Sequence, residues 1–179
     1  VRIIRALVAV LMVISPALPQ KLSLPAIPSG QDLELESRFE LVWEDEFEGD
    51  SLDTTKWGFP WWETERKGGY WHEDLVSVKD GNLVITTAYY EKPLENYYYE
   101  NWHDRINFDD YKSGWYTGCI ETQHKYEQCY GYFECRCILP KSSGMWSAFW
   151  MMNDGVSNVD GSGQDGTEVD VFESMFYKD

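Results

Sequence analysis

Glu168-Val169-Asp170-Val171-Phe172-Glu173 is the stretch of this 179-residue chain that says most about its fold. Side chains of a regular strand alternate between its two faces, so Glu168 and Asp170 share a face and Glu173 would point the other way. One extra residue in a β-bulge at Val171-Phe172 would return Glu173 to the face of the other two acids. The sequence therefore predicts a bulged strand that presents three carboxylates on one face.

The spacing of the two glutamates suits the cleavage of glycosidic bonds. Four strand rises of ~3.3 Å separate their Cα atoms by about 13 Å. Side chains that lean inward by about 4 Å each leave roughly 5 Å between the carboxyl groups, as retaining glycoside hydrolysis requires. The valines and Phe172 between the acids predict a buried setting for them. The alternative is a solvated outer face of a strand.

The rest of the chain from Phe39 onward is predicted to form short strands and turns without a long helical period. A turn is predicted at Asp80–Asn82, because Gly and Asn flanked by β-formers are typical of turns. Strands at this spacing indicate an antiparallel sandwich. The predicted strands are Leu41–Trp43, Leu83–Thr87, a hairpin of Gly118–Tyr126 and Tyr132–Leu139, Met145–Met152 and Thr167–Phe176.

Two long segments rich in aromatic residues, Pro60–Trp71 and Glu91–Tyr116, do not fit short connections between strands. Loops of this length are usually either functional or poorly ordered. Aromatic residues make up 16% of the chain, and aromatic faces suit the apolar faces of sugar rings. We interpret the two segments as ligand-binding loops, with poor order as the alternative.

The N-terminus has the pattern of an export signal. Arg2 and Arg5 precede the apolar run Ala6–Ile14, and Ser15 and Ala17 are small residues that suit cleavage after residue 17. The nine-residue run is shorter than the roughly 20 residues of a membrane-spanning helix. A buried N-terminal helix is the alternative. We predict a signal peptide (1–17), a linker (18–38) and a catalytic domain (39–179) of a secreted protein, extracellular or periplasmic.

The charge of the chain restricts its partners. The formal net charge is −16, and removal of residues 1–17 with two arginines takes it to −18. Such a surface repels nucleic acid and anionic lipid, so neither nucleic acid nor a membrane is an expected partner. The same charge favours a neutral polysaccharide over a sulfated one. Solubility alone is the plainer explanation.

The cysteines and histidines do not predict a metal site. Four cysteines, which lie between positions 119 and 137, contain no C-x-x-C spacing, and the three histidines are scattered. Cys135 and Cys137 point to one face of a predicted strand and are badly placed to bridge each other. Thiols buried as small hydrophobic groups are preferred to a disulfide.

The acidic stretch resembles the E-x-D-x-x-E signature of glycoside hydrolase family sixteen, in its bulged, laminarinase-like form. The resemblance extends in order from about Phe39 to Phe176. Its further motifs are V-W-E-D-E-F at 42–47, L-D at 52–53, K-W at 56–57, Y-T-G at 116–118, Y-G-Y-F-E-C-R at 130–136, L-P-K at 139–141 and G-M-W-S-A-F-W at 144–150.

The resemblance implies a concanavalin-like β-jelly-roll sandwich of two antiparallel sheets. It also implies retaining endo-hydrolysis of a β-linked polysaccharide, most simply a β-1,3- or mixed β-1,3/1,4-glucan. Carried over by position, Glu168 is the nucleophile, Glu173 the acid/base, and Asp170 a hydrogen-bond partner of the nucleophile. The alternatives are a hydrolase of red-algal galactans from the same family and a glucan-binding lectin without catalysis.

Four further residues are expected at the substrate. Trp146 and Trp150 lie four apart on a predicted strand and so share a face. The resemblance implies that such tryptophans stack on sugar, and core packing is the alternative. Glu134 and Arg136 alternate onto the polar face of their strand and are expected to reach the cleft.

The resemblance also carries expectations about metals and completeness. It implies no required cofactor, but the full-length protein could hold a structural calcium ion near Glu46. The loop 154–166 is interpreted as a cleft rim. Family domains continue past the catalytic strand, whereas this chain ends six residues after Glu173, so we expect a domain truncated at its C-terminus. A monomer is expected.

Overall fold

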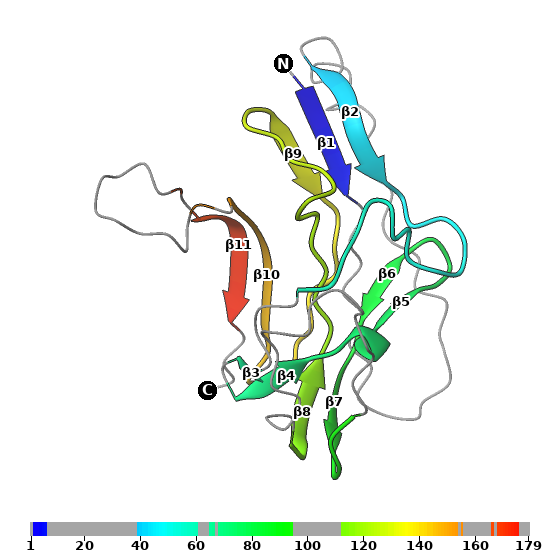
Figure 1. The fold of residues 1–179 in the computed structure, drawn as a ribbon, viewed down its shortest axis with the longest axis vertical. Coiled ribbons are helices and arrows are strands. Elements are labelled where there is room, and N and C mark those ends of the chain that lie inside the picture. Colours follow the sequence, from blue (N-terminus) through cyan, green and yellow to red (C-terminus); the bar gives the residue numbers. More distant parts are fainter. Residues whose placement is uncertain are drawn as a thin grey trace. The chain divides into compact units, whose positions relative to one another are not determined.

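The regular secondary structure of the described residues consists almost entirely of short β-strands. The computed structural model describes residues 2–6, 39–60, 65–66, 68–94, 112–153, 155, 166 and 168–175, and Figure 1 shows their arrangement. The strands are β1 Arg2–Ala6, β2 Glu40–Asp45, β3 Glu65–Arg66, β4 Gly69–Trp71, β5 Val76–Val78, β6 Leu83–Ile85, β7 Thr87–Tyr90, β8 Gly114–Thr117, β9 Tyr132–Cys135, β10 Trp146–Met152 and β11 Glu168–Met175. A 3₁₀ turn, η1 Glu73–Leu75, precedes β5. This composition confirms the all-β prediction.

The described strands group into four small sheets, where the sequence predicted two antiparallel ones. Their orders are β2-β1-β9, β3-β4-β8-β7, β5-β6 and β10-β11. Strand β1 pairs in parallel with both β2 and β9, and β4 pairs in parallel with β8. Strand β1 lies within the predicted signal peptide.

The turn predicted at Asp80–Asn82 is present and joins β5 to β6. The backbone N–H groups of Lys79 and Asn82 each donate to the carbonyl of the other, at 2.9 and 3.0 Å. Asp80 and Gly81 both have positive φ, 52° and 71°, as a two-residue type I′ hairpin requires. The strand predicted over Leu83–Thr87 is interrupted, however. Thr86 donates its N–H to Leu75, so β6 ends there and β7 continues in another sheet.

The hydrophobic core lies beside β2, β5 and β6. Phe47, Trp57, Val78 and Leu83 are buried together, and Leu83 has no exposed surface. The buried carboxylate of Asp45 is satisfied within this core: one oxygen accepts the N–H of Phe47 at 2.8 Å and the other accepts the indole N–H of Trp57 at 2.7 Å. The V-W-E-D-E-F motif therefore has a structural role here.

The hairpin predicted for Gly118–Tyr126 and Tyr132–Leu139 is wrong. Strand β8 ends at Thr117, residues 118–126 contain no strand, and β9 pairs with β1. The backbone at Gly118 approaches β5 so closely that a Cβ atom there would lie 2.5 Å from Val76 Cγ2. Glu121 instead forms an isolated antiparallel bridge with Gly58. Long-range contacts thus override the local alternation.

Parts of the two aromatic segments are strands and not loops. Tyr70 lies on β4, and its ring stacks on the ring of Tyr116 at 4.9 Å, with Tyr116 fully buried. Burial raises the pKa of the Tyr116 hydroxyl above its usual value. The predicted ligand-binding residues Trp61, Trp62, Tyr97–Tyr99 and Trp102 lie outside the described residues.

The chain divides into two compact units, residues 1–137 and 138–179. The first contains strands β1–β9 with the core just described, and the second contains the β10–β11 hairpin. No helix among the described residues has the length and hydrophobicity to cross a membrane.

Candidate active site

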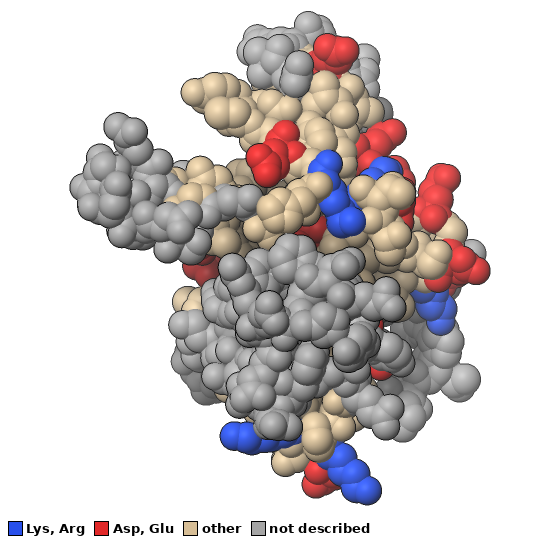
Figure 2. Space-filling model, viewed as in Figure 1, with Lys and Arg blue, Asp and Glu red and all other residues tan. Residues whose placement is uncertain are grey.

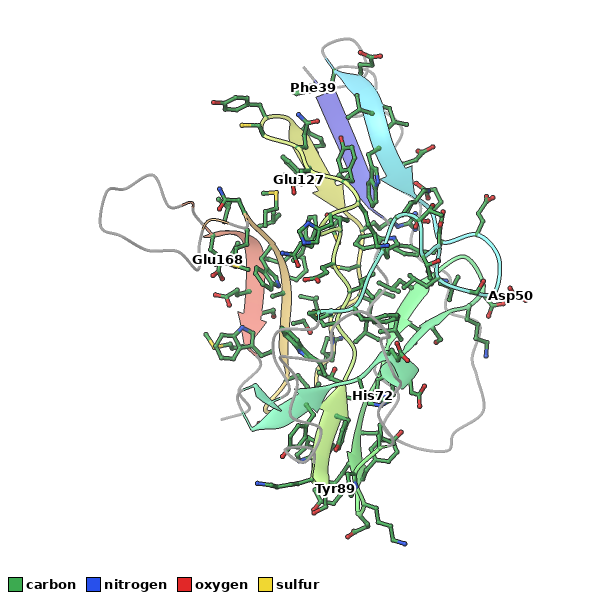
Figure 3. All side chains as sticks on the ribbon, viewed as in Figure 1. Phe39, Asp50, His72, Tyr89, Glu127 and Glu168 are labelled. Carbon is green, nitrogen blue, oxygen red and sulfur yellow. The ribbon has the colours of Figure 1, made fainter. Side chains whose placement is uncertain are left out.

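The three carboxylates of the E-V-D-V-F-E stretch lie on β11, which pairs antiparallel with β10. Figure 3 labels Glu168 at the start of this strand. The predicted strands Met145–Met152 and Thr167–Phe176 are therefore confirmed. Strand β10 begins one residue later than predicted and ends at the predicted residue, and Thr167 and Phe176 lie outside the described residues.

The register of the pair contains the predicted bulge. Phe149 lies opposite Phe172, and the next residue, Trp150, lies opposite Asp170. Val171 is consequently the extra residue on β11. A bulge of this kind shifts the side-chain alternation by one position. It is located where the sequence predicted it.

The bulge places all three acids on one face. Ala148, Trp150 and Met152 are two residues apart on β10 and so share a face. Their register partners on β11 are Glu173, Asp170 and Glu168 respectively. Directly opposed residues of an antiparallel pair lie on the same face. The opposite face carries Phe149 and Phe172, whose ring centroids lie 6.3 Å apart.

Both predicted tryptophans belong to the acidic face. Trp146 continues the alternation of Ala148 and Trp150 on β10 and lies opposite Met175. It is 43% exposed, and Trp150 is half-buried. Within the hairpin the two tryptophans share a face, as predicted, and this face also bears the acids. Trp146 is not a buried core residue.

The buried setting predicted for the carboxylates is wrong. Glu168, Asp170 and Glu173 are all exposed. The two valines between them are exposed as well, Val169 by 46% and Val171 by 45%, so they do not enclose the acids. The apolar character of the strand serves its opposite face, where Phe172 is half-buried.

A hydrogen bond that the sequence did not predict joins the two strands on this face. The indole N–H of Trp146 donates to Oε1 of Glu173 at 3.1 Å. The two residues are 27 positions apart. Trp146 is opposite Met175, so Glu173 is its diagonal neighbour, two residues away on the paired strand. Antiparallel pairing of the two predicted strands would have been the signal for this contact.

The other two predicted substrate residues belong to the first unit. Glu134 lies on β9 and Arg136 directly follows that strand, and both are half-buried. Their part in substrate binding stays a prediction. The predicted cleft rim at 154–166 lies outside the described residues except for Gly155 and Gly166.

The four cysteines are free thiols, as predicted, but the predicted burial is wrong: Cys129 is exposed and the other three are half-buried. Cys135 and Cys137 are close enough for a side-chain hydrogen bond, which lowers the pKa of the Cys137 thiol to about 7, against the opposing effect of burial. This pair lies in the first unit and not in the hairpin that bears the acids.

Metal binding finds no support in the described residues. They contain no group of three or more His, Cys, Asp or Glu side chains that could hold an ion. Exposed acids lie at the end of β2 and directly after it, toward the right-hand edge of Figure 2, where Figure 3 labels Asp50: they are Glu44, Glu46, Glu48 and Asp50. A calcium ion near Glu46 stays a prediction.

Comparison with known proteins points to one family. Residues 64–177 match the sequence model described as Glycosyl hydrolases family 16. The chain is 31% identical over 144 residues to glucan endo-1,3-beta-glucosidase A1 of Niallia circulans, which covers 75% of this chain and 20% of that protein. It is also 31% identical over 134 residues to beta-porphyranase B of Zobellia galactanivorans, covering 73% of this chain and 40% of that protein.

A solved structure shares the fold. The catalytic domain of an endo-1,3-beta-glucanase (laminarinase) from Thermotoga petrophila RKU-1 matches with a TM-score of 0.54 at 23% identity, over 78% of this chain and 52% of that one. This likeness shows the fold class, the all-β jelly roll that was predicted. The chain spans between a fifth and about half of the length of these proteins.

Proposed function

The chain belongs to glycosyl hydrolase family 16, and from that premise we propose that it carries the catalytic carboxylates of a retaining endo-hydrolase of β-linked polysaccharides. The observation that carries the proposal is the bulged register of β10 and β11. It brings Glu168, Asp170 and Glu173 to one face together with Trp146 and Trp150. Paired carboxylates beside aromatic rings are the groups that glycoside cleavage needs.

In the proposed reaction Glu168 acts as the nucleophile and Glu173 as the acid/base. A carboxylate oxygen of Glu168 attacks the anomeric carbon, the bond from that carbon to the glycosidic oxygen breaks, and the proton of Glu173 passes to this oxygen. The result is a glycosyl ester of Glu168 and a carboxylate at Glu173. A water molecule then attacks the same carbon and gives its proton to Glu173, which frees Glu168 with the β-configuration retained. Asp170, between them, is the proposed hydrogen-bond partner of the nucleophile.

The proposed substrate is a neutral β-glucan with β-1,3 or mixed β-1,3/1,4 linkages. One similar protein is named a glucan endo-1,3-beta-glucosidase and another an endo-1,3-1,4-beta-glycanase. The net charge of −16 favours a substrate without sulfate groups. Trp146 and Trp150 are the proposed stacking platforms for glucose rings, and Glu134 and Arg136 the proposed polar contacts. We further propose that the protein works as a monomer and needs no cofactor.

The export signal at residues 1–17 remains part of the proposal, with the linker 18–38 and the catalytic domain 39–179. Cleavage after Ala17 would remove β1, which lies between β2 and β9 in the chain described here. The secreted protein would then begin at Leu18, and an intact-mass measurement on protein from the culture medium or periplasm tests this position.

The decisive experiment is Glu168→Gln in the full-length protein. The amide keeps the size of the side chain but cannot attack the anomeric carbon, so turnover of laminarin and lichenan should fall by at least about 10³-fold. Binding of the same glucans should be largely kept. The matched control is Glu127→Gln, an exposed glutamate on the segment before β9, which should leave turnover unchanged. Substantial residual hydrolysis by the Glu168 variant would place the nucleophile elsewhere.

The same assay distinguishes the proposed glucanase from two other functions. Similarity to beta-porphyranase B favours a galactan hydrolase as the second candidate. Agarose cleavage without laminarin cleavage by the full-length enzyme would favour that candidate. Glucan binding without hydrolysis by the parent protein would indicate a lectin, for which the acidic face has no chemical use.

A further inference from the structure

The hydrogen bond between Trp146 and Glu173 has a consequence for the acid/base itself. Ala148 is the residue directly opposite Glu173, and it offers only a methyl group. The indole of Trp146 reaches across from its diagonal position, two residues away from Ala148 on β10. Its N–H thereby meets Oε1 of Glu173 at 3.1 Å.

An indole N–H can donate a hydrogen bond but cannot accept one. The Glu173 oxygen that receives it must therefore offer a lone pair in both protonation states of the carboxyl group. When Glu173 is an acid, its carbonyl oxygen is the stronger acceptor, so the hydrogen bond stabilises the form in which Oε1 is that carbonyl oxygen and the proton lies on Oε2. The contact thus makes the two oxygens of this carboxyl group chemically different.

We infer that Trp146 is a positioning residue for the acid/base: it holds Glu173 through Oε1 and leaves Oε2 to carry the proton to the leaving oxygen. This inference rests on the proposed function. General acid catalysis depends on the geometry of the proton donor relative to the leaving oxygen. A side chain held at one oxygen presents the proton of the other in one direction.

Stacking on sugar is a separate role of the same residue, and the two can be told apart. The ring faces of Trp146 are not used by the bond to Glu173, which involves the edge nitrogen. Loss of stacking weakens the binding of every substrate that contains the same sugars. Loss of the N–H affects only those substrates whose leaving group must receive a proton.

The experiment compares two glycosides of the same β-glucan oligosaccharide in the full-length enzyme. One has a sugar as leaving group, which needs a proton, and the other has a dinitrophenyl group, which needs none. The variant Trp146→Phe keeps an aromatic ring and removes the N–H. The quantity measured is kcat/KM, because it reports the first chemical step and not the later attack of water.

The expected result is a loss of about tenfold in kcat/KM for the sugar leaving group, the size of one hydrogen bond lost from a transition state. The dinitrophenyl substrate should lose only the factor that weaker stacking on phenylalanine imposes on both substrates, so its loss should be about tenfold smaller than that of the sugar leaving group. Trp150→Phe, on the same face but opposite Asp170, should change both substrates by the same factor.

Equal losses on both substrates for Trp146→Phe would overturn the inference and leave Trp146 as a stacking or packing residue. A variant that folds poorly would also lose activity equally on both substrates, and its melting temperature shows whether this is the cause. If the parent enzyme cleaves neither glycoside, the proposed function fails and the inference fails with it. Parent activity with equal losses in the variant refutes the inference alone.

Discussion

Glu173 receives an indole hydrogen bond on one carboxylate oxygen and is exposed, so its second oxygen is accessible to a reacting group. This arrangement suits a residue that gives and takes protons, whereas a nucleophile must approach the anomeric carbon itself. The assignment of Glu168 as nucleophile and Glu173 as acid/base can therefore be tested at the level of each side chain.

We expect Glu173→Ala to be rescued by azide. A dinitrophenyl glycoside can still form the glycosyl ester of Glu168 in this variant, because its leaving group needs no proton. Water then attacks slowly without a base, but azide needs no deprotonation and should restore turnover by about tenfold or more. The product, identified by NMR, should be the β-azide. An α-azide, or no rescue, would contradict the role given to Glu173.

Cys137 provides a pH-dependent test of local structure in the first unit. The hydrogen bond from Cys135 lowers the pKa of Cys137 from its ordinary 9.0 to about 7. The thiolate therefore forms at lower pH than in an isolated cysteine, and thiolate is the form that reacts with iodoacetamide. We expect the alkylation rate of Cys137, followed by peptide mass spectrometry, to be half-maximal near pH 7.

The control for this measurement is Cys135→Ala. Without its hydrogen-bond partner the Cys137 thiolate is less stable, so its alkylation midpoint should rise toward 9. An unchanged midpoint in this variant would mean that Cys135 does not set the reactivity of Cys137.

At the scale of elements, the β10–β11 hairpin is the part of the fold that the sequence predicted best. Its two strands depend on local alternation, and its bulge follows from the requirement that Glu173 share a face with Glu168. Local turn chemistry likewise predicted the Asp80–Gly81 hairpin. Both features are decided by residues close together in the chain.

Elements that depend on distant contacts were not predictable in this way. Residues 118–126 have the alternation of a strand, yet Gly118 packs against β5 and Glu121 bridges to Gly58. The contact of Trp146 with Glu173 likewise needs the strand register and not only the sequence. The exposure of the three acids does not follow from their apolar neighbours, because Val169 and Val171 are themselves exposed.

The bulge itself can be tested by deletion of Val171. Removal of Val171 shortens E-V-D-V-F-E to E-V-D-F-E, in which regular alternation keeps Glu168, Asp170 and Glu173 on one face without a bulge. We therefore expect the full-length deletion variant to keep hydrolysis within about tenfold of the parent, because both glutamates still face the substrate. Circular dichroism and thermal unfolding show whether the variant still folds.

Val171→Ala is the matched control, because it shortens the side chain but keeps the residue count and therefore the register. It should retain activity within a few-fold of the parent. A loss of about 10³-fold in a deletion variant that still folds, with Val171→Ala active, would show that the bulge does more than keep the three acids on one face.

At the scale of the whole molecule, the dominant physical property is negative charge, with 31 acidic residues against 15 basic ones. A surface of one sign repels polyanions over distances set by salt, about 10 Å at 0.1 M ionic strength. It has little effect on a neutral polymer. The charge therefore discriminates between a neutral and a sulfated polysaccharide, provided that the protein recognises the polymer by hydrogen bonds and stacking.

We expect the full-length Glu168→Gln protein, which binds but does not cleave, to show opposite salt responses to the two classes of polysaccharide. Its affinity for laminarin should be unchanged within about twofold between about 20 mM and about 300 mM NaCl, because the ligand has no charge to screen. Its affinity for a sulfated galactan should be weak at low salt and should increase with salt, because screening relieves repulsion from the excess of acidic side chains in this chain. Isothermal titration calorimetry on both polymers measures this, with desulfated galactan as the control for backbone recognition. Tighter binding of the sulfated polymer at low salt would mean that local basic residues such as Arg136 govern recognition, and would favour the galactan hydrolase over the glucanase.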